Sequence, residues 1–156
     1  MALPPDQFSA LKHAAMAAKQ TAYCPYSSFR VGAALLLSDT RTLITGANVE
    51  NAAYPAGTCA ERVALGKAVT WVDEGEETAT GEGVRESVRK GGILALGVAT
   101  DVTPPASPCG MCRQFIREFC KLSMPIYMFD RDGNHVVKTL EELLPMSFGP
   151  EDLVKG

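Results

Sequence analysis

The sequence predicts an α/β protein, a three-layer α/β/α sandwich with a mixed five-stranded sheet at its centre. Five short β-rich segments alternate with helical patterns along the chain. The order strand, helix, strand occurs twice in succession, which favours parallel pairing with helices covering the faces of the sheet. At 156 residues, 46% of them hydrophobic, the chain can bury one core, so we expect a single domain over residues 1–156.

The expected elements follow from the spacing of apolar residues. After Pro4 and Pro5, apolar positions recur every three or four residues, which predicts an amphipathic helix that ends near Tyr23 to Pro25. Two further helical patterns run from Thr58 to Trp71 and from Cys109 to Cys120. The predicted strands are residues 29–37, 42–49, 93–100, 125–129 and 135–138. We expect the first two to form a hairpin, and the segments 42–49, 93–100 and 126–129 to pair in parallel through the helices between them.

The second helix has a candidate cap. Thr58 follows the turn-prone Pro55-Ala56-Gly57, and Glu61 stands three positions later, as in a capping box. This interpretation competes for the Glu61 carboxylate with a chemical role.

An acidic segment separates this helix from the third strand. Residues 73–92 hold six acidic and three basic residues and account for the formal net charge of −3. We expect a mobile surface insertion and not a second domain. The remainder is close to neutral, so a nucleic-acid partner is not expected. Neither a membrane span nor a secretory leader is evident, which predicts a cytoplasmic protein.

The cysteines carry the first chemical signal. Five cysteines, an odd number, include the tight spacing Cys109-Gly-Met-Cys112, which suits metal binding better than a disulfide framework in a reducing compartment. Cys59 lies fifty residues upstream and is followed by Ala60 and Glu61. Both groups stand at predicted helix N-termini, where free N–H groups favour the metal-binding thiolate. We expect the three sulfur atoms to meet at one edge of the sheet.

Three sulfur ligands predict a catalytic zinc and not a structural one. A structural zinc has four protein ligands, whereas three leave a position for water. The pair Cys109 and Cys112 alone is equally compatible with redox chemistry, and the combination with Cys59-Ala-Glu61 favours metal. Cys24 and Cys120 are interpreted as buried thiols, and His13 and His135 as surface or structural residues.

Together these motifs resemble the homotetrameric zinc-dependent cytidine deaminases, of the cytidine and deoxycytidylate deaminase superfamily. The likeness runs along residues 23–34, Asn48-Val-Glu-Asn51, Cys59-Ala-Glu-Arg62, 108–114 and 142–153. The resemblance implies hydrolytic deamination of cytidine and deoxycytidine to uridine and deoxyuridine, with one zinc per subunit and active sites at subunit interfaces.

The resemblance also assigns residue roles. It makes Cys59, Cys109 and Cys112 the zinc ligands, Glu61 the proton shuttle and Arg62 a hydrogen-bond donor to the zinc thiolates. It assigns substrate contacts to Phe29, Asn48, Glu50, Tyr54, the backbone of Ala60, the loop Pro105 to Pro108, and Phe148 of a neighbouring subunit.

Several rival functions remain at this point. Deaminases of polynucleotides or of deoxycytidylate need cationic phosphate contacts, which this sequence lacks. A nucleoside antibiotic deaminase of the blasticidin type shares Cys-Ala-Glu, although residues 48–51 and 147–149 favour cytidine. A non-enzymatic zinc-binding module, with Glu61 as helix cap or fourth ligand, is the remaining alternative.

Overall fold

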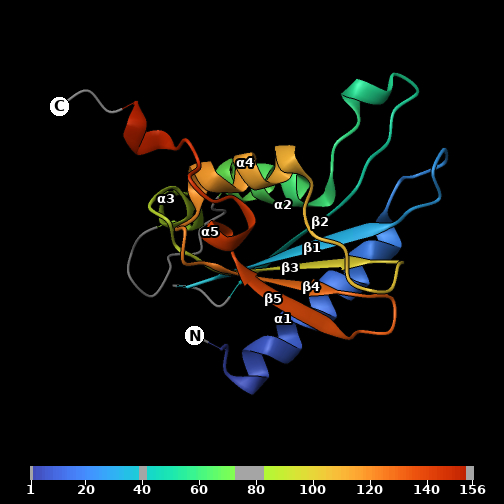
Figure 1. Ribbon diagram of the computed structural model, residues 1–156, viewed down its shortest axis with the longest axis horizontal. Helices are drawn as coiled ribbons and strands as arrows, with labels where there is room; N and C mark the ends of the chain where they lie inside the picture. Colours follow the sequence, from blue (N-terminus) through green and yellow to red (C-terminus); the bar gives the residue numbers. More distant parts are fainter. Residues whose placement is uncertain (1, 39–41, 73–82, 154–156) are drawn as a thin grey trace.

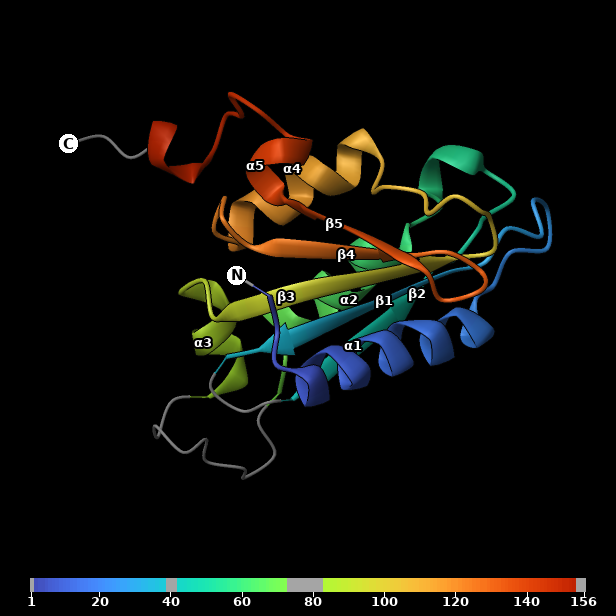
Figure 2. The same cartoon turned by 60° about the horizontal axis from the view of Figure 1, so that its bottom comes forward.

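A computed structural model describes residues 2–38, 42–72 and 83–153 as a five-stranded sheet with helices on both faces (Figures 1 and 2). In chain order the elements are α1 (Pro5–Ala18), η1 (Lys19–Thr21), β1 (Val31–Leu37), β2 (Leu43–Ala47), η2 (Tyr54–Ala56), α2 (Ala60–Val69), α3 (Val84–Arg89), β3 (Ile93–Thr100), α4 (Gly110–Phe119), β4 (Pro125–Phe129), β5 (His135–Thr139), α5 (Leu140–Leu143) and η3 (Pro150–Asp152). The predicted fold class is confirmed.

The strand order is β2-β1-β3-β4-β5. Strand β1 pairs antiparallel with both β2 and β3, β3 pairs parallel with β4, and β5 closes the sheet antiparallel to β4. The expected parallel pairing is therefore right for β3 and β4 and wrong for β2 and β3. The hairpin places β1 between β2 and β3, which run in the same direction without being neighbours.

Two hydrophobic clusters fill the faces of the sheet. On one face α1 lies across the strands, with Leu11 and Ala15 fully buried against the sheet (Figure 2). Helix α1 packs very close to β1, since a Cβ atom on Gly32 would lie 2.2 Å from the carbonyl oxygen of Ala15. On the other face α2 and α4 cover a core that includes Leu96 and Ile116. Burial on both faces explains why β1 and β3 are continuous apolar runs.

The helix starts and ends differ from expectation in two places. Helix α1 ends at Ala18 and continues as a 3₁₀ turn to Thr21, short of the predicted end near Tyr23. The capping box at Thr58 is wrong, because the backbone of Thr58 is extended and exchanges two hydrogen bonds with Val49, of 2.8 and 2.9 Å. Helix α2 therefore begins at Ala60 without a side-chain cap, and the Glu61 carboxylate is free of that role.

The expectation of a purely mobile surface insertion at residues 73–92 is wrong for its second half. Residues 84–89 form α3, which packs Val84 and Val88 into the core beside α2. The two valines stand four positions apart and face one side of the helix, but the surrounding Glu and Gly residues obscured this pattern. Residues 73–82 lie outside the described residues.

Among residues 2–38, 42–72 and 83–153, the search for a helix long and apolar enough to cross a bilayer finds none.

Candidate metal centre and substrate pocket

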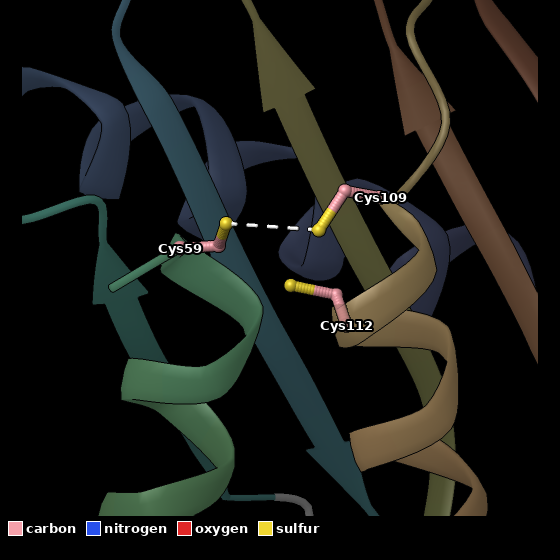
Figure 3. A group of neighbouring side chains, drawn as sticks. All are labelled: Cys59, Cys109 and Cys112. Atoms are coloured by element: carbon pink, nitrogen blue, oxygen red, sulfur yellow. Dashed lines mark hydrogen bonds between the residues drawn. The ribbon is translucent and has the colours of Figure 1, made fainter. Parts of the chain in front are cut away.

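The three predicted metal ligands meet where two helices begin. Cys59 directly precedes α2, Cys109 directly precedes α4, and Cys112 lies in the first turn of α4. Figure 3 shows the three sulfur atoms pointing toward one another across the gap between the two helix N-termini. The predicted convergence is confirmed.

The spacing of the sulfur atoms suits a single zinc ion. All three lie within 4.8 Å of one another, and the Sγ atoms of Cys59 and Cys109 are 3.9 Å apart. Tetrahedral zinc with Zn–S bonds of about 2.3 Å needs sulfur atoms about 3.8 Å apart. In the described part of the chain no His, Asp or Glu joins the three cysteines as a further ligand. The residues present therefore fit a zinc ion with one position open to water.

Hydrogen bonds and charge favour the metal-binding thiolate at Cys59 and disfavour it at Cys112. The Cys112 thiol donates to Cys59 and, together with the Arg62 guanidinium, lowers the pKa of Cys59 to about 5. The same hydrogen bond and burial raise the pKa of Cys112. One Nη of Arg62 lies 3.8 Å from the Cys59 Sγ, while its buried Nε finds no hydrogen-bond partner among the described residues. Arg62 thus supplies positive charge directly at the sulfur cluster, as the resemblance implies.

Glu61 is a buried carboxyl group beside the sulfur cluster. It follows Cys59 by two positions, and only 3% of its surface is exposed. Burial raises the pKa of Glu61, and the neighbouring Cys59 thiolate raises it further. A raised pKa makes a carboxyl group a better proton acceptor than an ordinary glutamate, as a proton shuttle requires.

A cavity of about 550 Å³ opens over Cys59, Cys109 and Glu61, while Cys112 is buried behind its wall. Its walls include several residues to which the sequence assigns roles, namely Phe29, Asn48, Glu50, Tyr54, Cys59, Glu61, Arg62 and Cys109. They also include residues to which no sequence motif assigns a role, among them Ser27, Val98, Thr100 and Met111. Val98 and Thr100 alternate along β3, and in sequence they cannot be separated from ordinary core positions.

Two predicted substrate contacts lie elsewhere in this chain. Ala60 is fully buried at the start of α2 and does not line the cavity, so a substrate contact through its backbone stays a prediction. Phe148 lies in the C-terminal segment, is 58% exposed, and its carbonyl accepts a 3.0 Å hydrogen bond from Gln114. Phe148 is absent from the cavity wall of its own chain.

Asn48 and Glu50 line the cavity but are already hydrogen-bonded within the chain. Both lie beyond β2, which ends at Ala47 and not at residue 49 as predicted. The Asn48 side chain accepts from Val31 N and donates to Phe29 O, each at 2.8 Å. The Glu50 carboxylate accepts hydrogen bonds from the backbone N–H groups of Tyr26 and Ser27 and from the Ser27 hydroxyl.

Arg113, to which no sequence motif assigns a role, holds the loop before α4 in place. Arg113 donates hydrogen bonds to Pro108 O, the Ser107 hydroxyl and Leu143 O, at 2.8, 2.8 and 2.7 Å. These bonds fix the cavity wall next to Cys109. Only the position of Arg113 directly after Cys112 hinted at this role.

The remaining cysteines and histidines stay outside the site. Cys120 is buried as expected, whereas Cys24 is half-exposed. His13 and His135 are both exposed, and the His135 ring packs 4.9 Å from that of Phe8. All five cysteines are free thiols.

Comparison with known proteins agrees with this geometry. Residues 5–128 match the family described as the cytidine and deoxycytidylate deaminase zinc-binding region. The chain belongs to this family. It is 45% identical over 136 residues to a cytidine deaminase of Sporosarcina psychrophila, covering 87% of each chain. It is 40% identical over 139 residues to a cytidine deaminase of Halalkalibacterium halodurans, covering 89% of this chain and 92% of the relative.

A solved structure of a cytidine deaminase has the same fold as this chain. The crystal structure of cytidine deaminase from Burkholderia pseudomallei matches with a TM-score of 0.75 at 38% identity, covering 90% of this chain and 98% of that chain.

Proposed function

We propose that this protein hydrolyses cytidine and deoxycytidine to uridine and deoxyuridine with release of ammonia, as a zinc-dependent enzyme of pyrimidine salvage. One observation carries the proposal: three sulfur atoms that fit a zinc ion lie beside a buried carboxyl group at the floor of a cavity. A volume of about 550 Å³ suits a small-molecule ligand such as a nucleoside.

Each subunit would hold one zinc ion through Cys59, Cys109 and Cys112. When it is bound by three protein ligands, zinc lowers the pKa of water toward about 7 and so supplies a nucleophile at neutral pH. Three thiolates make the cluster anionic, and the Arg62 guanidinium at 3.8 Å from Cys59 offsets part of that charge.

Glu61 would move the protons of the reaction. It would accept one proton of the attacking water and donate it to ring N3 as the oxygen adds to C4. It would then accept the second proton of that oxygen and donate it to the amino group, so that the C4–N bond breaks, ammonia leaves and the C4 carbonyl forms. One carboxyl group suffices because it is regenerated within the cycle. Its burial, with 3% of its surface exposed, keeps bulk water from exchanging these protons.

Asn48 and Glu50 would bind the ribose 3′-hydroxyl with the hydrogen-bonding capacity that the fold leaves over. The Asn48 amide uses one acceptor and one donor on Val31 and Phe29, so a second donor hydrogen stays free. The Glu50 carboxylate accepts three bonds and keeps one further lone-pair position. Phe29 and Tyr54 would add apolar contacts.

We also propose a homotetramer in which Phe148 of a neighbouring subunit completes each site. Exposed apolar side chains around the cavity mouth and in the C-terminal segment support a second copy as the partner, namely Tyr23, Tyr26, Tyr54, Met146 and Phe148. Five free thiols and no disulfide in the described chain suit the cytoplasm as its location.

The test follows the fall in pyrimidine absorbance for cytidine, deoxycytidine, cytosine, cytidine monophosphate and blasticidin in parallel. We expect turnover of the first two. Glu61→Gln should lower kcat by about 10²–10⁴-fold while zinc content and fold persist, whereas Glu118→Gln, an exposed substitution on α4, should match the wild type.

The rival functions give different results in the same experiment. A zinc-loaded, folded protein inactive on every substrate would indicate a binding module. Preferential turnover of blasticidin would indicate an antibiotic deaminase. A metal-free protein in which Cys109 and Cys112 oxidise reversibly would indicate redox chemistry.

A further inference from the structure

One wall of the cavity is formed by a strained segment that precedes the sheet. Phe29 and Val31 line the cavity, and β1 begins only at Val31. Ser28 has a φ of 55°, a left-handed conformation that costs energy for a residue other than glycine. The Phe29 side chain therefore needs contacts outside the strand ladder to stay in place. The Asn48 side chain supplies one such attachment, through its hydrogen bonds with Val31 N and Phe29 O.

Arg30 supplies a second attachment for this segment. It lies between Phe29 and Val31 and binds the Asp101 carboxylate with two donors, Nε to Oδ2 at 2.9 Å and one Nη to Oδ1 at 3.1 Å. Its other Nη donates to the Gln20 side chain at 2.7 Å. A bidentate pair of this kind fixes orientation as well as distance.

Asp101 begins the loop that forms a second wall of the cavity. The loop leads from the end of β3 to Ala106 and Ser107, which line the cavity. Lys19, whose side chain is 4% exposed, binds both Asp101 Oδ1 at 3.0 Å and the carbonyl of Thr100 at 3.1 Å. The base of this wall is therefore anchored to the first helical segment as well as to Arg30.

Further along, the same loop is attached to the body of the protein. The Thr103 hydroxyl donates to Asp130 at 3.3 Å, and the Arg131 N–H donates to Val102 O at 3.3 Å. The β1–β3 ladder ends with Val31 opposite Thr100, so the Arg30–Asp101 pair extends the link between the two walls one residue beyond the sheet.

We propose that Arg30 and Asp101 are positioning residues of the substrate pocket, whose ion pair sets the separation between the Phe29 wall and the Ala106–Ser107 wall. The inference rests on the proposed function. Neither side chain lines the cavity, so both act through other residues. Because they hold walls and do not touch the reacting atoms, they should govern nucleoside binding and leave the turnover of bound substrate nearly unchanged.

The decisive variant is Arg30→Gln. Asp101→Asn would leave the buried Lys19 charge without its partner and could unfold the protein, whereas Arg30 is 43% exposed and Asp101 keeps Lys19 when Arg30 is replaced. We expect the KM for cytidine to rise about five-fold with kcat within about two-fold of wild type. The Kd for the product uridine, measured by calorimetry, should rise by the same factor.

Two companion variants separate positioning from simple stabilisation. Arg30→Lys keeps the charge but loses the planar guanidinium group, so its KM should lie between those of the wild type and Arg30→Gln. Arg131→Gln breaks an exposed ion pair with Asp132, whose side chains are 65% and 60% exposed, and serves as the matched control with unchanged KM. A merely structural role would lower the unfolding midpoint of Arg30→Gln and leave KM and uridine affinity unaltered.

Wild-type turnover, measured first, distinguishes the two proposals. If the zinc-loaded wild type does not deaminate cytidine, the proposed function fails and this inference fails with it. If the wild type is active and the KM of Arg30→Gln stays within about two-fold of it, or Arg131→Gln raises KM equally, the positioning role alone is overturned.

Discussion

The cysteine cluster and the edge formed by Asn48 and Glu50 border the same cavity. They differ in how far their side chains are already hydrogen-bonded to the backbone of the chain. The three sulfur atoms lie within 4.8 Å of one another, so that one metal ion could bind between them. The side chains of Asn48 and Glu50 instead hold the backbone of residues 26–31 and retain only spare capacity for a ligand. The cysteine cluster is thus arranged to bind a metal ion. Asn48 and Glu50, the proposed recognition edge, serve first as a structural brace.

The largest expected effect is on the cysteine cluster. Cys109→Ser should lose zinc and lower kcat/KM by more than about 10³-fold, because two sulfur ligands cannot hold the ion in place. Metal analysis and the deamination assay on the same sample measure both. Cys24→Ser, a half-exposed thiol outside the cluster, is the control. A Cys109→Ser protein with full zinc and near-normal turnover would remove the proposed ligand set.

Asn48→Ala tests the double role of the recognition edge. The change deletes two 2.8 Å hydrogen bonds and the spare donor, so we expect kcat/KM to fall about 10²-fold and the free energy of unfolding to fall by about 1–2 kcal/mol. Denaturant titration and kinetics on one preparation separate the two effects.

Asn134→Ala provides the contrast to Asn48→Ala. Its side chain donates one 3.1 Å bond to Asp130 in the β4–β5 turn, away from the cavity. It should lower stability and leave KM unchanged. If Asn48→Ala lowers stability alone, as Asn134→Ala should, the recognition edge is a brace and nothing more.

The metal centre could be predicted from the sequence because it depends on residue type and spacing. Cys59-Ala-Glu61 and Cys109-x-x-Cys112 specify ligands whose chemistry is the same wherever they meet, and the strand and helix pattern predicted that they would meet. The strands from Ile93 and Pro125 were predicted with their observed limits because they are short, continuously apolar and bounded by breakers.

The missed features depend on partners that are distant in sequence. The start of α2 was misplaced because Thr58 pairs with Val49, a contact that local capping rules do not include. Helix α3 was missed because only two valines in a Glu-rich segment reach the core. The Arg30–Asp101 pair joins residues 71 positions apart, and no pattern in the sequence distinguishes it from other surface charges.

A substitution of Arg62 tests whether charge next to the cysteine cluster affects the rate more than it affects zinc binding. Arg62→Ala should lower kcat about tenfold while zinc occupancy falls less, because Arg62 withdraws charge from the Cys59 sulfur and is not itself a ligand. Arg62→Lys should recover part of the rate. The measurements are kcat and zinc content at saturating metal, and normal turnover of Arg62→Ala at full zinc loading would exclude this role.

The smallest effect concerns the stability of the cavity walls in acid. Arg30, followed by Lys19, lowers the pKa of Asp101 to about 2 in the folded protein, below the value of about 3.9 in an unfolded chain. Asp101 therefore adds stability above the unfolded pKa, and this contribution is lost as the pH falls toward 2. Because solvent screens this partly exposed pair, we expect the loss between pH 5 and pH 3 to stay below about 1 kcal/mol.

Urea titrations of the wild type and Arg30→Gln at both pH values isolate this contribution, since the other carboxylates and the thiolates titrate alike in the two proteins. Arg30→Gln removes the main cause of the low pKa, so its free energy of unfolding should fall less between pH 5 and pH 3 than that of the wild type. Equal losses in both proteins would mean that the Arg30–Asp101 pair contributes no stability in solution, and that the β1–β3 pairing and the other attachments hold the two walls.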